Sequence, residues 1–201
     1  RARHQAIYEF LVPIVKGWST ELSIDVASLG VQVHGGMGFI EETGAAQYYR
    51  DARILTIYEG TTAIQANDLI GRKTVRDGGA TAQAILAQMD QTIAQLSGRD
   101  GQAFKSLHRY LSAGSLSLAR VVEFMVAKVK SDPNAVFAGS VPYLKLAGIV
   151  FGGWQMARAL LVASDKRAED EAFYGAKIAT AQFFAEHILS QAPGIEASVS
   201  Y

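Results

Sequence analysis

The spacing of the apolar residues constrains the fold of this chain more than any other feature. Along most of the sequence these residues recur every three or four positions, which is typical of helices with one buried face. The chain holds only four prolines, and long runs of alternating Val, Ile and Thr, which would indicate strands, are scarce. The sequence therefore predicts an all-α protein, an up-down helical bundle with an additional helical C-terminal region.

Short segments rich in Gly, Asp and Pro separate the predicted helices. The stretch Asp77-Gly78-Gly79 divides the chain most clearly, because these residues break both helices and strands. We therefore expect one helical domain over residues 1–77 and an appended helical region over residues 78–201. The helices are expected at about residues 7–33, 45–53, 62–71, 80–96, 102–130, 141–163 and 171–191, with a turn at residues 131–134 and a loose tail after Ala192-Pro193-Gly194.

Composition excludes several classes of protein. With 201 residues the chain can bury a sizeable core. Its formal net charge is zero, so nothing points to a nucleic-acid partner. It has no cysteine, which excludes disulfides, thiolate metal sites and cysteine nucleophiles and fits a reducing compartment. The chain opens without Met and without an apolar leader, so we expect a fragment of a longer protein that carries no signal peptide.

Gly148 and Gly152 lie four residues apart in the most apolar segment of the chain, a spacing that also occurs where membrane helices pack closely. Lys145, Gln155 and Arg158 interrupt this segment. A charged residue at the centre of a bilayer costs about 2.5–3.5 kcal/mol. The segment is therefore predicted to be a buried helix of a soluble bundle that crosses a neighbouring helix closely at its glycines, without a membrane span.

A carboxylate, a glycine and two threonines stand together within residues 57–65, just before a predicted helix. Thr61 or Thr62 could be the N-cap, whose side-chain oxygen accepts a hydrogen bond from a free backbone N–H. The start of a helix could equally hold an anion or an electronegative ring edge. Glu59 precedes this start and could abstract a proton from whatever binds there.

The four histidines are far apart and show no metal-ligand spacing, so no metal site is predicted. His34 differs from the others because it precedes Gly35-Gly36-Met37-Gly38, which we interpret as a turn between helices. Three glycines would also let the backbone of this turn come close to a ligand. No strand precedes the turn, so a dinucleotide-binding fingerprint is not indicated.

Three motifs occur in an order and at a spacing that resemble a known family. They run from Gln32 to Phe39, from Tyr49 to Arg53, and from Ile57 through Glu59-Gly60-Thr61 to Ile64-Gln65. Together they resemble the C-terminal helical domain of the acyl-CoA dehydrogenase family, over residues 14–73. The sequence after Asp77 is similar to the extra helical region of larger members, including those that act on 3-methylmercaptopropionyl-CoA.

The resemblance implies an FAD-dependent enzyme that dehydrogenates an acyl-CoA thioester between its α and β carbons. Glu59 matches the catalytic base, which takes the α-proton and is therefore expected in a site shielded from water. Gly60 matches a residue beside the acyl chain, where a side chain would obstruct the substrate. The implied FAD contacts are Thr61, Thr62 and Ala63 at the helix start, together with Gln32, Val33, His34, Gly35 and Gly36, which match a segment that reaches the FAD of a neighbouring subunit.

Several partners follow from the same resemblance. It implies a homodimer or a homotetramer, with electron-transfer flavoprotein or a similar protein as the electron acceptor. It also implies a location in the bacterial cytoplasm or, in a eukaryote, in the mitochondrial matrix. Arg50 and Asp51 are expected to hold the fold rather than to touch the substrate.

Two departures from the family pattern limit what the chain is expected to do. Many members carry Gln at the position of Ala63, so any FAD contact there has to come from the backbone. The family's N-terminal helical domain and β-domain, which supply most flavin and CoA contacts, have no counterpart in the sequence. We therefore expect the chain alone to bind FAD weakly or not at all and to be inactive. An acyl-CoA oxidase-like flavoprotein and a non-catalytic helical oligomerisation module remain alternatives.

Overall fold

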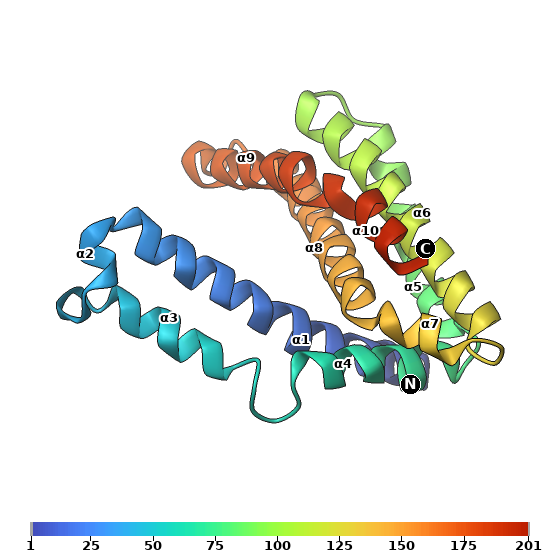
Figure 1. Ribbon diagram of the computed structural model, residues 1–201. Helices are drawn as coiled ribbons and strands as arrows, with labels where there is room; N and C mark the ends of the chain where they lie inside the picture. Colours follow the sequence, from blue (N-terminus) through green and yellow to red (C-terminus); the bar gives the residue numbers. More distant parts are fainter. Residues whose placement is uncertain (1, 201) are drawn as a thin grey trace.

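The computed structural model describes residues 2–200, and within that range the chain forms helices and turns without a strand. The all-α prediction is thus confirmed. Figure 1 shows the helices in chain order. Their bounds are α1 (Ala2–Val33), α2 (Gly36–Phe39), α3 (Ala45–Ile54), α4 (Thr62–Asp68), α5 (Ala80–Ser97), α6 (Gln102–Lys128), α7 (Pro133–Ala138), α8 (Ser140–Asp165), α9 (Glu171–His187) and α10 (Ala192–Ser200), with 3-10 turns at Glu41–Thr43 and Leu189–Gln191 and a π-helical segment at Leu69–Val75.

The first part of the chain is a long hairpin of helices. α3 runs back along the C-terminal half of α1, and the short α2 connects them at a tip that points away from the rest of the molecule (Figure 1). α4 then packs on the N-terminal half of α1. That half is fixed in the core because Phe10 and Ile14 are almost fully buried. The hairpin therefore projects from a firmly packed base.

The remaining helices pack around α6 and α8. Leu107 and Leu111 on α6 and Leu146 and Leu160 on α8 are fully buried. By length and composition alone, α6 and α8 are apolar enough to cross a membrane, and 44% and 56% of their apolar windows are buried inside the fold. Core helices of soluble proteins have the same hydropathy, so the absence of a membrane span stays a prediction.

α8 joins the two parts of the chain through its glycines. A Cβ atom built on Gly148 would overlap the Trp18 ring of α1, lying 2.7 Å from Cδ1 and closer still to Cγ. One on Gly152 would lie 2.9 Å from Cζ of Phe184 on α9. The predicted close crossing at these glycines is confirmed. Both parts of the chain consequently belong to one hydrophobic cluster, although a turn lies at the predicted boundary at Asp77-Gly78-Gly79.

A buried pair of hydroxyl groups ties α8 to the π-helical segment that follows α4. The Thr74 hydroxyl donates to the Leu69 carbonyl oxygen at 2.8 Å, and its Oγ1 lies 2.9 Å from Oη of Tyr143. Because the Thr74 proton is already used, the Tyr143 hydroxyl is the donor of the second bond. Burial raises the pKa of Tyr143, so this phenol remains a protonated donor.

Some local predictions were wrong. The tail expected to be loose is the helix α10, in which Ala192 and Val199 are buried, and the turn predicted at residues 35–38 is built around the four-residue helix α2. Proline is tolerated in the first turn of a helix, where its missing N–H has no partner to lose, so Pro193 does not stop α10. Apolar spacing also predicts that Ile64 faces inward with Leu69 and Ile70, but Ile64 is 57% exposed, because the buried side of α4 and of the π-helical segment after it is formed by Ala66, Leu69 and Ile70.

Candidate functional site

The loop between α3 and α4 contains an unusual backbone conformation. Glu59 has a φ of 54° and is the one non-glycine residue with positive φ within residues 2–200. Gly60 follows with a φ of 94°. Residues with a Cβ rarely adopt this left-handed region, and they remain in it only where the surrounding structure determines it. The sequence-predicted base is therefore also the one non-glycine residue of the described backbone that is held in the left-handed region.

Two side chains of α1 bind this loop on either side of Glu59. The Lys16 amine donates to the carbonyl oxygens of Leu55 at 2.7 Å and Tyr58 at 3.2 Å, and it lies 4.8 Å from the centre of the Tyr58 ring. The Glu21 carboxylate accepts a 2.5 Å hydrogen bond from the Thr62 hydroxyl, at the first residue of α4. Residue patterns near the motif did not indicate these partners, because they lie about 40 positions earlier in the chain.

Gly60 is required by the backbone itself. Its φ of 94° favours glycine, and a Cβ atom at this position would lie 2.6 Å from Nε2 of Gln65. The family resemblance implied a different reason, namely that a side chain would obstruct the acyl group. The structure supplies a second reason, which is independent of any ligand.

The Glu59 side chain is exposed in this chain. The expectation that it lies in a site shielded from water is therefore not met by residues 2–200 alone. The cause is the position of the loop at the edge of the bundle, where Ile57 and Tyr58 are also exposed and no described helix covers them. A dry environment for this carboxylate has to come from something that packs over the loop.

The helix start has the position predicted for a cap but lacks the capping bond. Thr61 is the N-cap residue of α4, and its side chain accepts no hydrogen bond from the first turn. The Thr62 hydroxyl is directed to Glu21 instead. Thr61 and Ala63 are exposed and Thr62 is partly buried, so this edge is accessible to a ligand.

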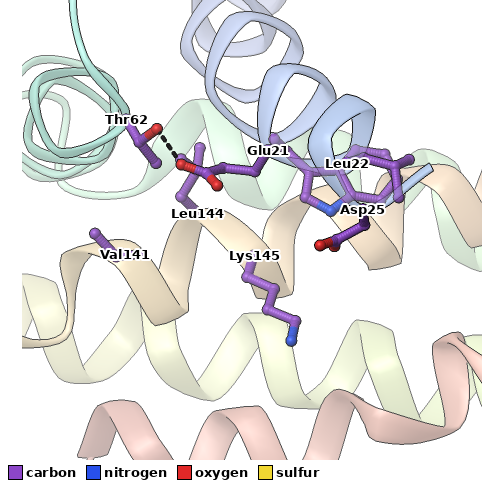
Figure 2. A pocket seen from close by; sticks show the side chains of 8 residues that line it. Glu21, Leu22, Asp25, Thr62, Val141, Leu144 and Lys145 are labelled. Atoms are coloured by element: carbon purple, nitrogen blue, oxygen red, sulfur yellow. Dashed lines mark hydrogen bonds between the residues drawn. The ribbon is translucent and has the colours of Figure 1, made fainter. Parts of the chain in front are cut away.

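A cavity of about 310 Å³ lies behind the helix start, between α1, α4 and α8 (Figure 2). Figure 2 shows Glu21 turned toward Thr62, while Asp25 and Lys145 extend along other walls. Within the described residues, neither Asp25 nor Lys145 makes a hydrogen bond or an ion pair through its side chain. The remaining lining residues are Trp18, Leu22, Val141 and Leu144.

The second predicted FAD segment lies at the tip of the hairpin. Gln32, Val33, His34, Gly35 and Gly36 are all exposed, and Gly35 has a φ of 61°. The His34 ring nitrogen Nδ1 donates to the Gly30 carbonyl oxygen at 2.8 Å, which fixes the ring against α1. The tip therefore presents a glycine-rich backbone to the outside.

The structure does not bring the two predicted FAD segments together. The tip and the Glu59 loop lie at opposite ends of α3 (Figure 1), and a helix of ten residues is about 15 Å long. One copy of the chain therefore presents them as two separate surfaces, one at each end of the hairpin.

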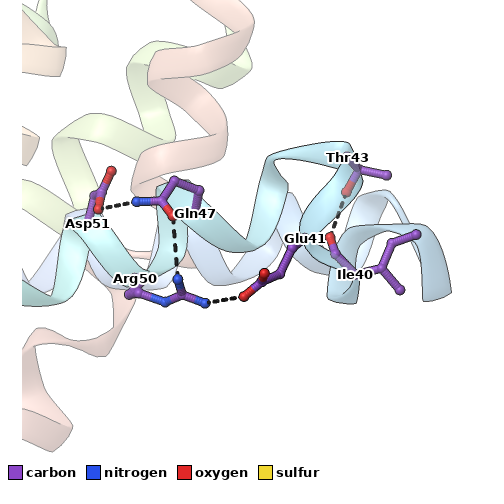
Figure 3. Close-up of polar contacts among 6 residues, drawn as sticks. All are labelled: Ile40, Glu41, Thr43, Gln47, Arg50 and Asp51. Carbon is purple, nitrogen blue, oxygen red and sulfur yellow. Dashed lines mark hydrogen bonds and ion pairs between the residues drawn. The ribbon is translucent and has the colours of Figure 1, made fainter.

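A polar network holds the tip of the hairpin together (Figure 3). Arg50 pairs with Glu41 at 3.1 Å, and the Gln47 amide donates to Asp51 at 2.7 Å. The Thr43 hydroxyl lies 2.6 Å from the Met37 carbonyl oxygen. The contacts of Arg50 and Asp51 are thus within the fold, as expected. A neighbouring groove of about 930 Å³ is mainly apolar, with Val31, Phe39, Ile40, Ala46 and Tyr49 among its lining residues.

The hairpin with its Glu-Gly-Thr loop defines a class of protein, the helical C-terminal part of an acyl-CoA dehydrogenase. The family described as "Acyl-CoA dehydrogenase, C-terminal domain" matches residues 1–73. The family described as "Acetyl-CoA dehydrogenase C-terminal like" matches residues 85–200. The chain therefore belongs to the acyl-CoA dehydrogenase family, as the motifs predicted.

Individual relatives agree with this assignment. The chain is 51% identical to 3-methylmercaptopropionyl-CoA dehydrogenase of Ruegeria pomeroyi, over 94% of this chain and 32% of that protein. It is 31% identical to the broad-specificity linear acyl-CoA dehydrogenase FadE5 of Mycobacterium tuberculosis, over 91% of this chain and 31% of that protein. The chain is 28% identical to a butyryl-CoA dehydrogenase of Syntrophomonas wolfei, over 92% of this chain and 30% of that protein. The chain thus spans about a third of the length of these relatives.

Proposed function

We propose that this chain is the C-terminal portion of an FAD-dependent acyl-CoA dehydrogenase in which Glu59 is the base. The observation that supports this best is the conformation of Glu59, which is held at positive φ in a loop bound by α1 on both sides. A family match over residues 1–73 surrounds this loop. Non-glycine residues held in the left-handed region cluster at active sites and ligand clamps.

The proposed reaction divides two hydrogens of the acyl group between two acceptors. The Glu59 carboxylate takes the α-carbon hydrogen as a proton, and the electrons of that bond form the new double bond as the β-carbon loses a hydride. FAD, when bound, supplies the acceptor for the hydride. The backbone N–H of Glu59 is proposed to hydrogen-bond the thioester oxygen, where negative charge develops. Gly60, which has no side chain, leaves room for the acyl chain.

The residues proposed to hold FAD suit that group but belong to two sites. Thr61, Thr62 and the Ala63 backbone would contact it at the accessible start of α4. The segment from Gln32 to Gly36 lies at the other end of the hairpin, so we assign it to the FAD of a second copy of the chain. A homodimer or homotetramer follows from this assignment. The exposed apolar residues Val33, Met37 and Phe39 at the tip support burial there by another molecule.

The isolated chain is expected to bind FAD weakly or not at all, because each copy offers only two separated parts of a cofactor site. Titration of the purified 201-residue chain with FAD, followed by flavin fluorescence, measures this. The intact protein serves as the positive control. A tight yellow complex that turns over an acyl-CoA would contradict the expectation.

The proposed function is tested on the intact protein that contains this chain. Anaerobic addition of an acyl-CoA substrate should bleach the flavin absorbance, and electron-transfer flavoprotein or an artificial dye should restore it. 3-Methylmercaptopropionyl-CoA and butyryl-CoA are the first substrates to try, since they correspond to the names of similar proteins. Peroxide release in air at the rate of turnover would favour the oxidase alternative. A protein that assembles but never bleaches with any acyl-CoA would favour an oligomerisation module.

A further inference from the structure

We propose that Lys16 and Glu21 are positioning residues that fix the orientation of Glu59, an inference that rests on the proposed function. We call these two side chains and the three hydrogen bonds they make to Leu55, Tyr58 and Thr62 the loop clamp. The clamp flanks the segment that contains Glu59 and Gly60. Lys16 holds the residues before this segment, and Glu21 holds Thr62 after it.

Lys16 holds the segment that leads into Glu59. Its amine donates to two backbone carbonyl oxygens, those of Leu55 and Tyr58, and the second belongs to the residue next to Glu59. The same amine lies over the Tyr58 ring, 4.8 Å from its centre. Hydrogen bonds from a charged donor are stronger than those between neutral groups. Lys16 therefore restricts the orientation of the peptide group between Tyr58 and Glu59, which directly precedes the left-handed residue.

Glu21 holds the segment that leaves Gly60. It accepts the Thr62 hydroxyl proton in a 2.5 Å hydrogen bond that is partly buried. Thr62 is the first residue of α4, so this bond fixes where the helix starts relative to α1. The cavity view shows the bond directly, with Glu21 reaching across from α1 to Thr62 (Figure 2).

The clamp is mounted on a rigid element, whereas the loop is otherwise held mainly at its start, by the buried Thr56 and by backbone bonds to Ile54. Lys16 and Glu21 stand five residues apart on α1, which corresponds to about 7.5 Å along a helix. α1 is fixed nearby by the buried Ile14 and by Trp18 against α8. By contrast, Glu59 and its neighbour Tyr58 are exposed and bury little apolar surface. Hydrogen bonds from α1 therefore add to the backbone bonds of Ile57 and Tyr58 to the Ile54 carbonyl oxygen in holding Glu59 in its left-handed conformation.

The inference is tested by removing each side of the clamp in the intact, FAD-loaded protein. Lys16→Met and Glu21→Leu should each lower kcat by about tenfold to a hundredfold, because a shift of about 1 Å in a reacting group can cost a hundredfold. KM for the acyl-CoA should change less than threefold, and FAD content should stay the same. Lys16→Arg should recover most of the lost kcat, since it restores a charged donor at the same position.

Matched controls come from the same cavity. Lys145→Met and Asp25→Leu make the same changes of charge as the clamp variants and lie in the cavity that Glu21 and Thr62 also line, but within the described residues neither side chain makes a hydrogen bond or an ion pair to the loop. Both should keep kcat within twofold of the parent. A double-mutant cycle adds a sharper test, because Glu21→Leu and Thr62→Val remove the same hydrogen bond. Thr62 is also a proposed FAD contact, so Thr62→Val alone is expected to lose at least as much kcat as Glu21→Leu. Adding Glu21→Leu to Thr62→Val should lower kcat no further when both carry the same FAD content.

Amide hydrogen exchange gives a readout that does not depend on turnover. In Lys16→Met and Glu21→Leu, the peptide covering residues 55–62 should exchange at least tenfold faster, while peptides from α6 and α8 should be unchanged. Faster exchange throughout the protein would mean that the residues support folding in general, and it would overturn the inference.

The kinetic results separate this inference from the proposed function. If Glu59→Gln abolishes turnover while Lys16→Met and Glu21→Leu match their controls, the clamp does not position the base and the inference alone is wrong. If Glu59→Gln retains turnover, the proposed function is wrong, and the inference falls with it because there is no base to position.

Discussion

Glu59→Gln in the intact protein is expected to lower kcat at least a hundredfold while FAD remains bound. Glutamine has nearly the same shape as glutamate, but its amide cannot accept the α-proton. General-base catalysis typically contributes about 10²- to 10⁴-fold to a rate. The hydrogen bonds of Lys16 and Thr62 do not involve the Glu59 side chain, so the loop should keep its conformation. Anaerobic dye reduction measures turnover, and the flavin-to-protein absorbance ratio measures FAD.

Glu42→Gln is the matched control for this experiment. Glu42 is also an exposed glutamate, but it lies at the other end of the hairpin, in the 3-10 turn after α2. Its replacement should leave kcat within twofold of the parent. Turnover in Glu59→Gln above about a tenth of the parent value would show that the α-proton leaves by another route.

Gly148→Ala is expected to destabilise the protein although it adds a single methyl group. That methyl would overlap the five-membered part of the Trp18 ring, close to the point where the ring joins its own backbone. The ring cannot move away there without shifting α1 or α8. Overpacking of this kind costs about 1–3 kcal/mol in the free energy of unfolding. For a chain of this size that corresponds to a fall in Tm of about 2–12 °C, which calorimetry or circular dichroism would measure.

The same substitution on α9 should have the opposite effect. A Cβ on Gly175 would meet nothing closer than the flexible end of Glu171, at 4.0 Å. Alanine is a better helix former than glycine by about 1 kcal/mol, so Gly175→Ala should leave stability unchanged or raise it. Trp18→Leu combined with Gly148→Ala should lose less than the sum of the two single variants, because leucine makes room for the methyl. An unchanged Tm in Gly148→Ala would contradict the close crossing of the two helices.

The helical fold could be read from the sequence because the apolar spacing along α1, α5, α6 and α8 is set by which face each helix buries. The ends of the helices were less predictable where a residue such as proline can either stop a helix or begin one. Pro193 was interpreted as a stop, yet it lies in the first turn of α10, and Pro133 begins α7 with Asp132 as its cap. Asp132 accepts from the Ala135 N–H at 3.0 Å. Only the packing of the neighbouring helices distinguishes these cases.

The candidate site was predicted in part. Glu59, Gly60 and the two threonines were identified as candidates because they are consecutive in the sequence and form a short motif before a helix. The positive φ of Glu59 and the partners Lys16 and Glu21 could not be predicted, since hydrogen bonds across about 40 residues leave no local pattern. The solvent exposure of Glu59 was also not foreseen, because it depends on what packs over the edge of the bundle and not on the loop itself.

Trp18 follows Lys16 and precedes Glu21 along α1, and its side chain lies against Gly148 and Gly152 of α8. Cutting the chain after Asp77 would uncover the indole together with Phe10, which stacks on Phe151. The surface of α1 that carries these rings is therefore built to be covered by α8. A chimera joined at that turn would need another apolar helix to cover this face of α1, because an exposed apolar surface of this kind promotes aggregation.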